Sequence, residues 1–117
     1  MSPGKRVFLD NAPRGWGFVV PPVDVVFVGA ADPAELVIAF FSTAAELPRR
    51  LPALAQQIYP AGALWIAWPR RAGGHHSDIT EAVVREQALP FGVVDVKVAA
   101  IDDDWSGLRF VWRVKNR

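Results

Sequence analysis

Two apolar runs joined by a helical segment constrain the fold of this 117-residue chain more than any other feature. The runs Glu35–Phe41 (ELVIAFF) and Ala63–Trp68 (ALWIAW) are short and almost continuously apolar, which is typical of strands buried on both faces. Between them, Thr43-x-x-Glu46 matches a helix capping box, and apolar residues recur at helical spacing as far as Ile58. A crossover of this length lets the two strands run parallel, with the right-handed connection that such units adopt.

A second helical segment follows the strand Ala63–Trp68, after a polar loop that contains two glycines. The pattern Asp78-x-x-Glu81 is a second capping box, so we expect Asp78 to cap the helix that it precedes. The helix is expected to end at Leu89–Gly92, where proline and glycine stand together. The middle of the chain therefore predicts the order strand, helix, strand, helix.

The last two runs of the chain alternate in polarity. Val93–Ile101 alternates valines with Asp95 and Lys97, and residues 108–115 alternate apolar side chains with arginine and lysine. Alternation is typical of strands with one covered face and one wet face, so we expect the valines on the covered face and the two charged residues on the wet face. Because Asp102–Gly107 has the composition of a turn, the two runs are predicted to form an antiparallel hairpin.

The N-terminal part supplies two further predicted strands, Lys5–Asp10 and Val23–Gly29, with a short helix at Arg14–Val20 between them. The link Ala30–Ala34 is too short for a crossover, so Val23–Gly29 and Glu35–Phe41 are expected to be antiparallel if they pair. With 51% hydrophobic residues and no internal repeat, residues 1–117 are expected to form a single domain. The predicted fold is α/β, with a mixed, mainly parallel sheet flanked by helices on its faces and an antiparallel C-terminal hairpin.

Composition excludes several classes of protein. The chain has no cysteine, which excludes disulfides, thiol nucleophiles and thiolate metal sites and fits a reducing cytoplasm, where we expect the protein to be located. The net charge of +1 creates no overall field toward nucleic acid or anionic lipid, so no nucleic-acid partner is expected. The longest uncharged stretch, Leu51–Pro69, contains three prolines and is interpreted as helix, turn and strand, so no membrane segment is expected either.

No cofactor and no metal ion are predicted. The one G-x-G in the chain, at Gly15 and Gly17, lies in a proline-flanked segment and lacks the third glycine of a dinucleotide or S-adenosylmethionine turn. The adjacent histidines His75 and His76 cannot both point the same way, and only Asp78 lies near them as a further ligand.

The loop after Ala63–Trp68 is the candidate binding site, because it lies between the carboxyl end of a strand and the N-terminus of a helix, where an anion is favoured. Trp68, Pro69 and Trp105 could add an apolar wall for a planar ligand or a partner protein. A solvated loop without a ligand is the competing interpretation. The candidate ligand-binding residues are Trp68, Pro69, Arg70, Arg71, Gly73, Gly74, His75, His76, Ser77, Asp78, Trp105 and Ser106.

No catalytic residue is assigned. Ser77, Asp78 and either His75 or His76 have the residue types of a catalytic triad, but all lie in one loop, where they cannot easily be aligned. The expected function is therefore that of a non-catalytic module that binds a small anionic ligand or a partner protein, and a homodimer is compatible with it.

Two resemblances extend this interpretation. The order strand, helix, strand, helix, hairpin resembles the C-terminal half of a class I methyltransferase, which implies a Rossmann-like frame and, as the alternative function, an enzyme with a non-standard active site. The chain also resembles the uncharacterised bacterial family named domain of unknown function 3052, in which we expect a lysine at the position of Arg70. The segments that carry this second resemblance are Leu64–Arg70, Val94–Val98 and Trp105–Leu108, with weaker agreement at Asn11–Pro13.

Overall fold

The computed structural model describes residues 5–14, 16, 25–70 and 77–117, and these build a six-stranded sheet in the order β2-β1-β3-β4-β6-β5. Strands β1 to β4 run parallel, and β6 is antiparallel to both of its neighbours, β4 and β5. The mixed, mainly parallel sheet and the antiparallel C-terminal hairpin are thus confirmed. The strands are β1 (Lys5–Asp10), β2 (Val25–Phe27), β3 (Leu36–Phe40), β4 (Ala63–Pro69), β5 (Val93–Ala100) and β6 (Trp105–Trp112), and the α-helices among the described residues are α1 (Leu47–Gln57) and α2 (Glu81–Ala88).

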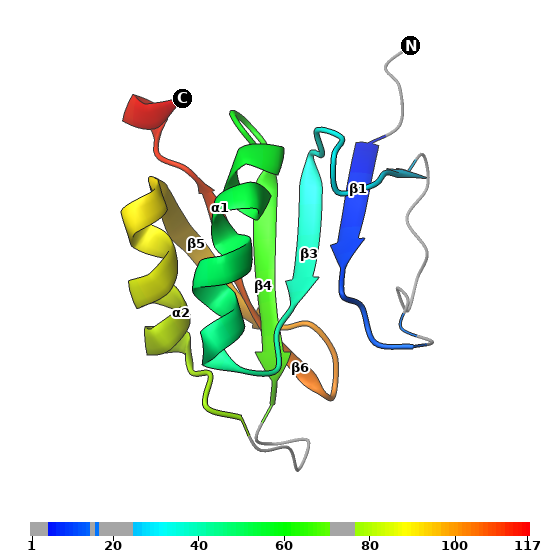
Figure 1. Ribbon diagram of the computed structural model, residues 1–117, viewed down its shortest axis with the longest axis vertical. Coiled ribbons are helices and arrows are strands. Elements are labelled where there is room, and N and C mark those ends of the chain that lie inside the picture. The colour runs from blue at the N-terminus through cyan, green and yellow to red at the C-terminus, as the bar shows by residue number, and fades with distance from the viewer. Residues whose placement is uncertain (1–4, 15, 17–24, 71–76) are drawn as a thin grey trace.

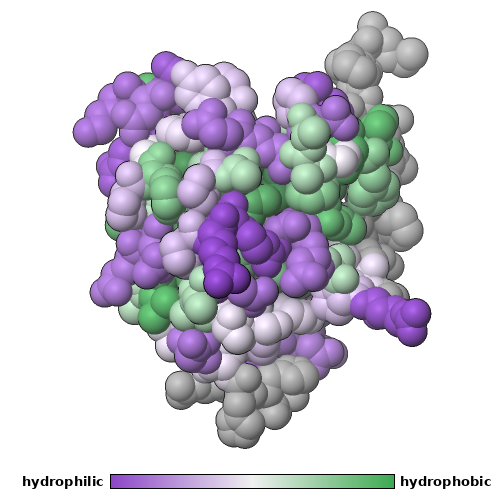
Figure 2. Space-filling model, viewed as in Figure 1, coloured by the Kyte–Doolittle hydropathy of each residue, from purple (hydrophilic) through white to green (hydrophobic). Residues whose placement is uncertain are grey.

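Helices α1 and α2 lie side by side on the same face of the sheet (Figure 1). The predicted apolar face of α1 is buried, with Leu47, Leu51, Leu54 and Ile58 all packed in the main core. Burying each such side chain contributes roughly 1.5–3 kcal/mol, which outweighs the poor helix propensity of the prolines in this segment. Hydrophilic side chains cover most of the outer surface of this helical layer (Figure 2). Within the described part of the chain no helix is long and apolar enough to cross a membrane.

The opposite face of the sheet carries a second, smaller core, and no helix among the described residues lies on it. Here Ile38, Phe40 and Ala67 are buried, covered by side chains from the segment after β1 and from the β5–β6 turn. Trp65 packs against this second core whereas Trp68 packs in the main core, as their positions three apart on one strand predict.

Strand β1 separates β2 from β3, so the two strands that we expected to be antiparallel if paired do not pair. Both run parallel to β1. Their registers explain how a short link suffices, because Val7 of β1 is opposite both the last residue of β2, Phe27, and the first residue of β3, Leu36. The link therefore only steps across one strand. Gln57 holds it by donating from Nε2 to the carbonyls of Gly29 and Asp32 at 3.1 and 3.0 Å.

Strand β5 departs from the predicted alternation. A register irregularity between Asp95 and Lys97 places the two charged residues on opposite faces, because Asp95 pairs with buried Phe110 and Lys97 pairs with Arg109. Asp95 faces α2, where its Oδ2 accepts from Nε of Arg85 at 3.0 Å. The expectation that Asp95 and Lys97 share a wet face is thus wrong.

The valines of β5 are also less covered than predicted, since Val96 and Val98 are 49% and 55% exposed. In the partner strand, Leu108, Phe110 and Trp112 are buried as predicted. The alternation ends there, because Val114 lies in the short helix η4 (Val114–Asn116) and is exposed.

Candidate functional site

The carboxyl ends of β1, β3 and β4 meet at one edge of the sheet, and two regions of different character lie there. In open α/β sheets, ligands bind outside this edge, at the point where the strand order reverses. In this sheet the reversal falls between β1 and β3, since the chain continues from β1 to β2 on one side and returns to β3 on the other. We call the polar side chains at that point, those of Asp10, Asn11, Glu46 and Arg50, the switch-point network. We call the nearby hollow beside α2 the β4–α2 cleft.

The β4–α2 cleft is an open hollow of about 280 Å³. Four of the residues predicted for the candidate site come together in it: Trp68, Pro69, Ser77 and Ser106. Two of these residues, Trp68 of β4 and Ser106 of β6, are register partners in the sheet. Sequence reasoning missed the remaining lining residues, Ile79, Thr80 and Glu81, which form the entry to α2.

Asp78 caps a helix other than the one we predicted. Its Oδ1 accepts from the backbone N–H of Ala44 at 2.8 Å, at the start of the short helix η1 (Ala44–Glu46) that leads into α1. Helix α2 begins at Glu81 and is capped by Thr80, whose Oγ1 accepts from the N–H of Val83 at 3.3 Å. The capping box predicted at Asp78 is therefore wrong, because α2 begins at Glu81 and the residue directly before its first turn is Thr80.

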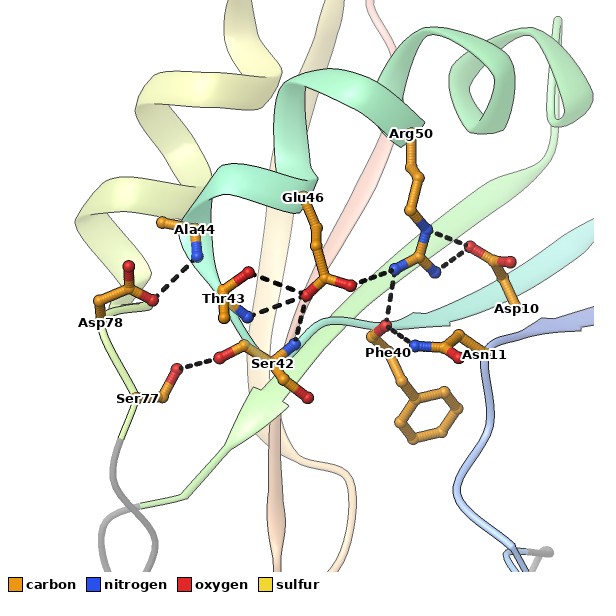
Figure 3. A network of polar contacts seen from close by, with 10 residues as sticks. All are labelled: Asp10, Asn11, Phe40, Ser42, Thr43, Ala44, Glu46, Arg50, Ser77 and Asp78. Atoms are coloured by element: carbon orange, nitrogen blue, oxygen red, sulfur yellow. Dashed lines mark hydrogen bonds and ion pairs between the residues drawn. The ribbon is translucent and has the colours of Figure 1, made fainter.

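Ser77 also ties the strand-to-helix segment to the neighbouring crossover. Its hydroxyl donates to the carbonyl of Ser42 at 3.0 Å and accepts from the N–H of Ile79 at 3.2 Å. With the bond from Asp78, two hydrogen bonds thus join the entry of α2 to the entry of α1 (Figure 3). One wall of the cleft is anchored to the segment that carries the switch-point network.

Arg70 does not line the cleft. Its backbone N–H donates to the carbonyl of Asp104 at 2.8 Å, and its Nη1 donates to the carbonyl of Asp102 at 3.1 Å, so the side chain braces the β5–β6 turn. Trp105 lies on the face of the sheet opposite Trp68, where its ring meets that of Phe40 edge-on at 5.0 Å. The apolar wall that we expected from the two tryptophans together is not formed.

The predicted site residues Arg71, Gly73, Gly74, His75 and His76 lie outside the described residues, as does most of the predicted helix Arg14–Val20.

The switch-point network centres on Arg50, which α1 projects over the ends of β1 and β3 (Figure 3). Its guanidinium is paired with the carboxylate of Asp10 through Nε at 3.0 Å and through Nη2, and it lies 3.8 Å from Oε1 of Glu46. Nη1 donates to the carbonyl of Phe40 at 3.0 Å, which also accepts from Nδ2 of Asn11 at 3.4 Å. The guanidinium also stacks 4.1 Å above the ring centroid of Phe41.

Glu46 completes the network and confirms the predicted capping box. Its Oε2 accepts from the N–H groups of Thr43 and Ser42 at 3.0 and 3.1 Å and from the hydroxyl of Thr43 at 3.1 Å. The hydrogen bond from the Thr43 backbone is the main reason why the pKa of Glu46 lies below its ordinary value; burial raises the pKa, and smaller contributions from Ser42, the Thr43 hydroxyl and Arg50 lower it. Glu46 is therefore ionised and holds one side of Arg50.

An aromatic cluster closes the opposite face beneath the network. The ring of Phe40 meets those of Trp16 and Trp105 edge-on, at centroid distances of 5.1 and 5.0 Å. The Trp16 indole donates from Nε1 to Oδ2 of Asp102 at 2.9 Å, which links the segment after β1 to the hairpin turn.

Sequence reasoning did not single out Asp10 or Arg50, since the one available signal, an acidic residue at a strand end, acquires meaning only once the strand order is known.

Comparison with known proteins supports the fold. No protein-family model matches the chain, and no curated protein matches it. Among solved structures it is similar to a chain of a fibrillarin/Nop5p complex (TM-score 0.56, 11% identity, covering 97% of this chain and 75% of that one). It is also similar to the Methanococcus jannaschii fibrillarin pre-rRNA processing protein (TM-score 0.52, 12% identity, 94% and 67%) and to the antibiotic-resistance methyltransferase Kmr (TM-score 0.50, 15% identity, 77% and 61%).

The chain thus spans 61% of the length of Kmr. At 11–15% identity these similarities show the fold alone. The protein has a methyltransferase-like, Rossmann-like sheet, as the order of its elements predicted.

Proposed function

We propose that this protein is a non-catalytic binding module built on a methyltransferase-like sheet, which takes a small anionic ligand or a segment of a partner protein in the β4–α2 cleft. The proposal rests on one observation: the switch point is filled by a side chain of the protein itself. Where such sheets place their ligands, this chain places its own Arg50, held by Asp10, Glu46 and the carbonyl of Phe40.

A ligand at the switch point would have to displace Arg50. Each hydrogen bond to a charged group contributes about 1.5–3 kcal/mol, and a displaced Arg50 would leave both Asp10 and the Phe40 carbonyl without its donors. The rings of Trp16 and Trp105 close the other side of the same strand end. The standard cofactor position is therefore costly to open, whereas the β4–α2 cleft is already open.

The lining of the cleft supports a small ligand with polar groups. Trp68 supplies an apolar surface and Ser106 a hydroxyl that bonds to no described residue. The amino terminus of α2 borders the cleft at Thr80 and Glu81, and its N–H groups favour a negatively charged group. The carboxylate of Glu81 is paired with Arg85, whose Nη2 lies at 3.0 Å and whose Nε also pairs with Asp95.

Native mass spectrometry of the freshly purified protein tests the proposal. We expect a reproducible added mass that is retained in Ser106→Ala, which keeps the cleft open, and is lost in Ser106→Phe, which fills it. Circular dichroism of both variants checks that the sheet is intact. A clean mass for the native protein, or an added mass that survives Ser106→Phe, would overturn the cleft as the binding site.

The alternative function is that of an enzyme with the same frame, and the similarity to the methyltransferase Kmr favours it. Calorimetric titration with S-adenosylhomocysteine separates the two functions, because the product of methyl transfer binds a methyltransferase whatever its substrate. We expect no binding to the native protein. Binding that is lost in Asp10→Asn and kept in the cleft-filling variant Ser106→Phe would decide for the enzyme.

We also propose that the chain belongs with domain of unknown function 3052. Two of the segments that carry this resemblance are Leu64–Arg70 and Trp105–Leu108. They lie side by side, because β4 and β6 are paired and Pro69 is the register partner of Trp105. Motifs that are distant in sequence thus form one structural unit at the cleft, which supports the proposal.

A further inference from the structure

We propose that the outer edge of β5 is a second docking surface, separate from the β4–α2 cleft, for an extended acidic segment of a partner protein. We call it the β5 edge surface and define it by Val96, Lys97, Val98, Ala100 and Arg109. The inference does not depend on the function proposed for the cleft.

The position of β5 in the sheet makes its outer edge available. It is the last strand of the sheet, so only β6 pairs with it, and no described residue pairs with its other side. Its second half is the most exposed part of any strand of comparable length, with Val96 49% and Val98 55% accessible. An edge strand with free backbone groups and exposed valines is suited to accept a further strand.

The charges beside this edge indicate what the added strand carries. Lys97 and Arg109 are directly opposite each other in the β5–β6 ladder, and like charges in that position destabilise a sheet. Neither side chain makes an ion pair or hydrogen bond with any residue that the structure describes. The acidic residue of β5, Asp95, is bonded to Arg85 on the helix-covered face and cannot neutralise them. A carboxylate from outside would relieve the repulsion.

A second copy of the chain fits this edge less well than an acidic partner. Two β5 edges together would bring four unpaired cations close to one another, since Asp95 is already engaged. The irregularity between Asp95 and Lys97 also leaves only Lys97–Ala100 in regular pairing at the exposed end. The surface therefore favours a short extended segment with an acidic residue opposite Lys97.

Nuclear magnetic resonance on the ¹⁵N-labelled full chain tests the proposal with two capped hexapeptides, one alternating glutamate with valine and the other lysine with valine. We expect the acidic peptide to shift the amide signals of Lys97–Ala100 and of Arg109, and the basic peptide to leave them in place. Lys97→Gln and Arg109→Gln should each weaken the acidic peptide about two- to fivefold, as expected for a cross-strand charge pair. Arg113→Gln removes the same charge just beyond β6 and serves as the matched control, with unchanged affinity.

Three results would overturn the proposal. One is equal shifts with both peptides, which would show apolar contact without charge recognition. Another is equal weakening by Arg113→Gln, which would show a general effect of net charge. The third is a set of shifts at Lys97–Ala100 that appears on raising the protein concentration without peptide, which would show that a second copy occupies the edge. An acidic peptide N-methylated at every residue should not bind, because none of its backbone N–H groups can donate to β5.

Discussion

The switch-point network and the β4–α2 cleft lie at the same edge of the same sheet, yet one is filled and the other open. At the switch point the polar side chains are satisfied by one another: Arg50 joins Asp10, Glu46 and the carbonyl of Phe40. In the cleft, about 280 Å³ remains open beside Trp68 and Ser106. The frame thus sets where a ligand could bind, while a few side chains decide which of those places is accessible.

The two regions are also physically joined. The bonds from Ser77 to Ser42 and from Asp78 to Ala44 tie the wall of the cleft to the crossover that carries Glu46. Substitutions in the filled region should therefore cost mainly stability, while substitutions in the open region should change binding. Point substitutions in the two regions test this division.

The most disruptive change in the filled region is Phe40→Ala. Phe40 is 1% exposed and its ring meets both Trp16 and Trp105, so removing it leaves a cavity under the switch point. We expect the free energy of unfolding to fall by about 3–5 kcal/mol in urea denaturation. Phe27→Ala, at a side chain that is 60% exposed, is the control and should cost less than about 1 kcal/mol. Equal losses in the two variants would contradict the closed character of the site.

Arg50→Met should have the second-largest effect. The change keeps the apolar stem over Phe41 but removes the donors to Asp10 and to the Phe40 carbonyl. We expect a loss of about 1–3 kcal/mol in the free energy of unfolding, because a partly buried carboxylate is left without its cation. Arg49→Met, at the exposed neighbour, should stay within about 0.5 kcal/mol of the native protein.

A double-mutant cycle with Asp10→Asn shows whether the pair acts directly. If the Asp10–Arg50 pair carries the effect, the double variant should be more stable than the sum of the two single losses implies. Strict additivity would show that Arg50 acts mainly through the Phe40 carbonyl and the Phe41 ring. S-adenosylhomocysteine binding that appears only in Arg50→Met would show that this one side chain closes an otherwise intact cofactor site.

Much of the fold could be predicted from the sequence because local signals coincide with it. The leucines of α1 and the Thr43–Glu46 capping box are signals between residues close in sequence, and each stabilises the helix that it predicts. The hairpin of β5 and β6 is equally local. The sequence could not show that β1 lies between β2 and β3, because that order depends on a register in which Val7 pairs with both neighbours.

The errors at the candidate site have the same physical origin. Asp78 has the spacing of a cap for its own helix, but the N–H group that it reaches belongs to Ala44, more than thirty residues earlier. The alternation of β5 is regular in sequence, yet an irregularity after Asp95 turns the residues beyond it to the other face. At Asp78 a contact between distant segments overrides the local pattern, and in β5 an irregularity in the strand pairing does so. Four candidate residues still meet in the cleft, because the end of β4 and the start of β6 are neighbours in the ladder.

Asp78→Ala tests the link between the two regions and should have a moderate effect. It removes the acceptor for the N–H of Ala44, so we expect a loss of about 1 kcal/mol, as for other caps. Thr80→Ala is the matched change at the cap of α2 and should cost a similar amount. The two variants differ in where amide exchange accelerates. Asp78→Ala should affect Ala44–Glu46 and Thr80→Ala should affect Glu81–Val83, and a reversed pattern would contradict the observed capping.

The smallest predicted effect is a pH dependence carried by Glu46. Its pKa in the folded protein lies below the ordinary value of 4.5, chiefly because its carboxylate accepts the N–H of Thr43. The unfolded chain therefore binds a proton at a higher pH than the folded chain does. The stabilisation is fully present above the unfolded pKa and is lost as the pH falls through the folded one.

The gap in unfolding free energy between the native protein and Glu46→Gln should be constant near pH 7 and shrink below about pH 4.5. Glu86→Gln, which removes an exposed carboxylate with no described partner, should show no such change. A gap for Glu46→Gln that widens in acid would contradict a lowered pKa of Glu46 in the folded protein.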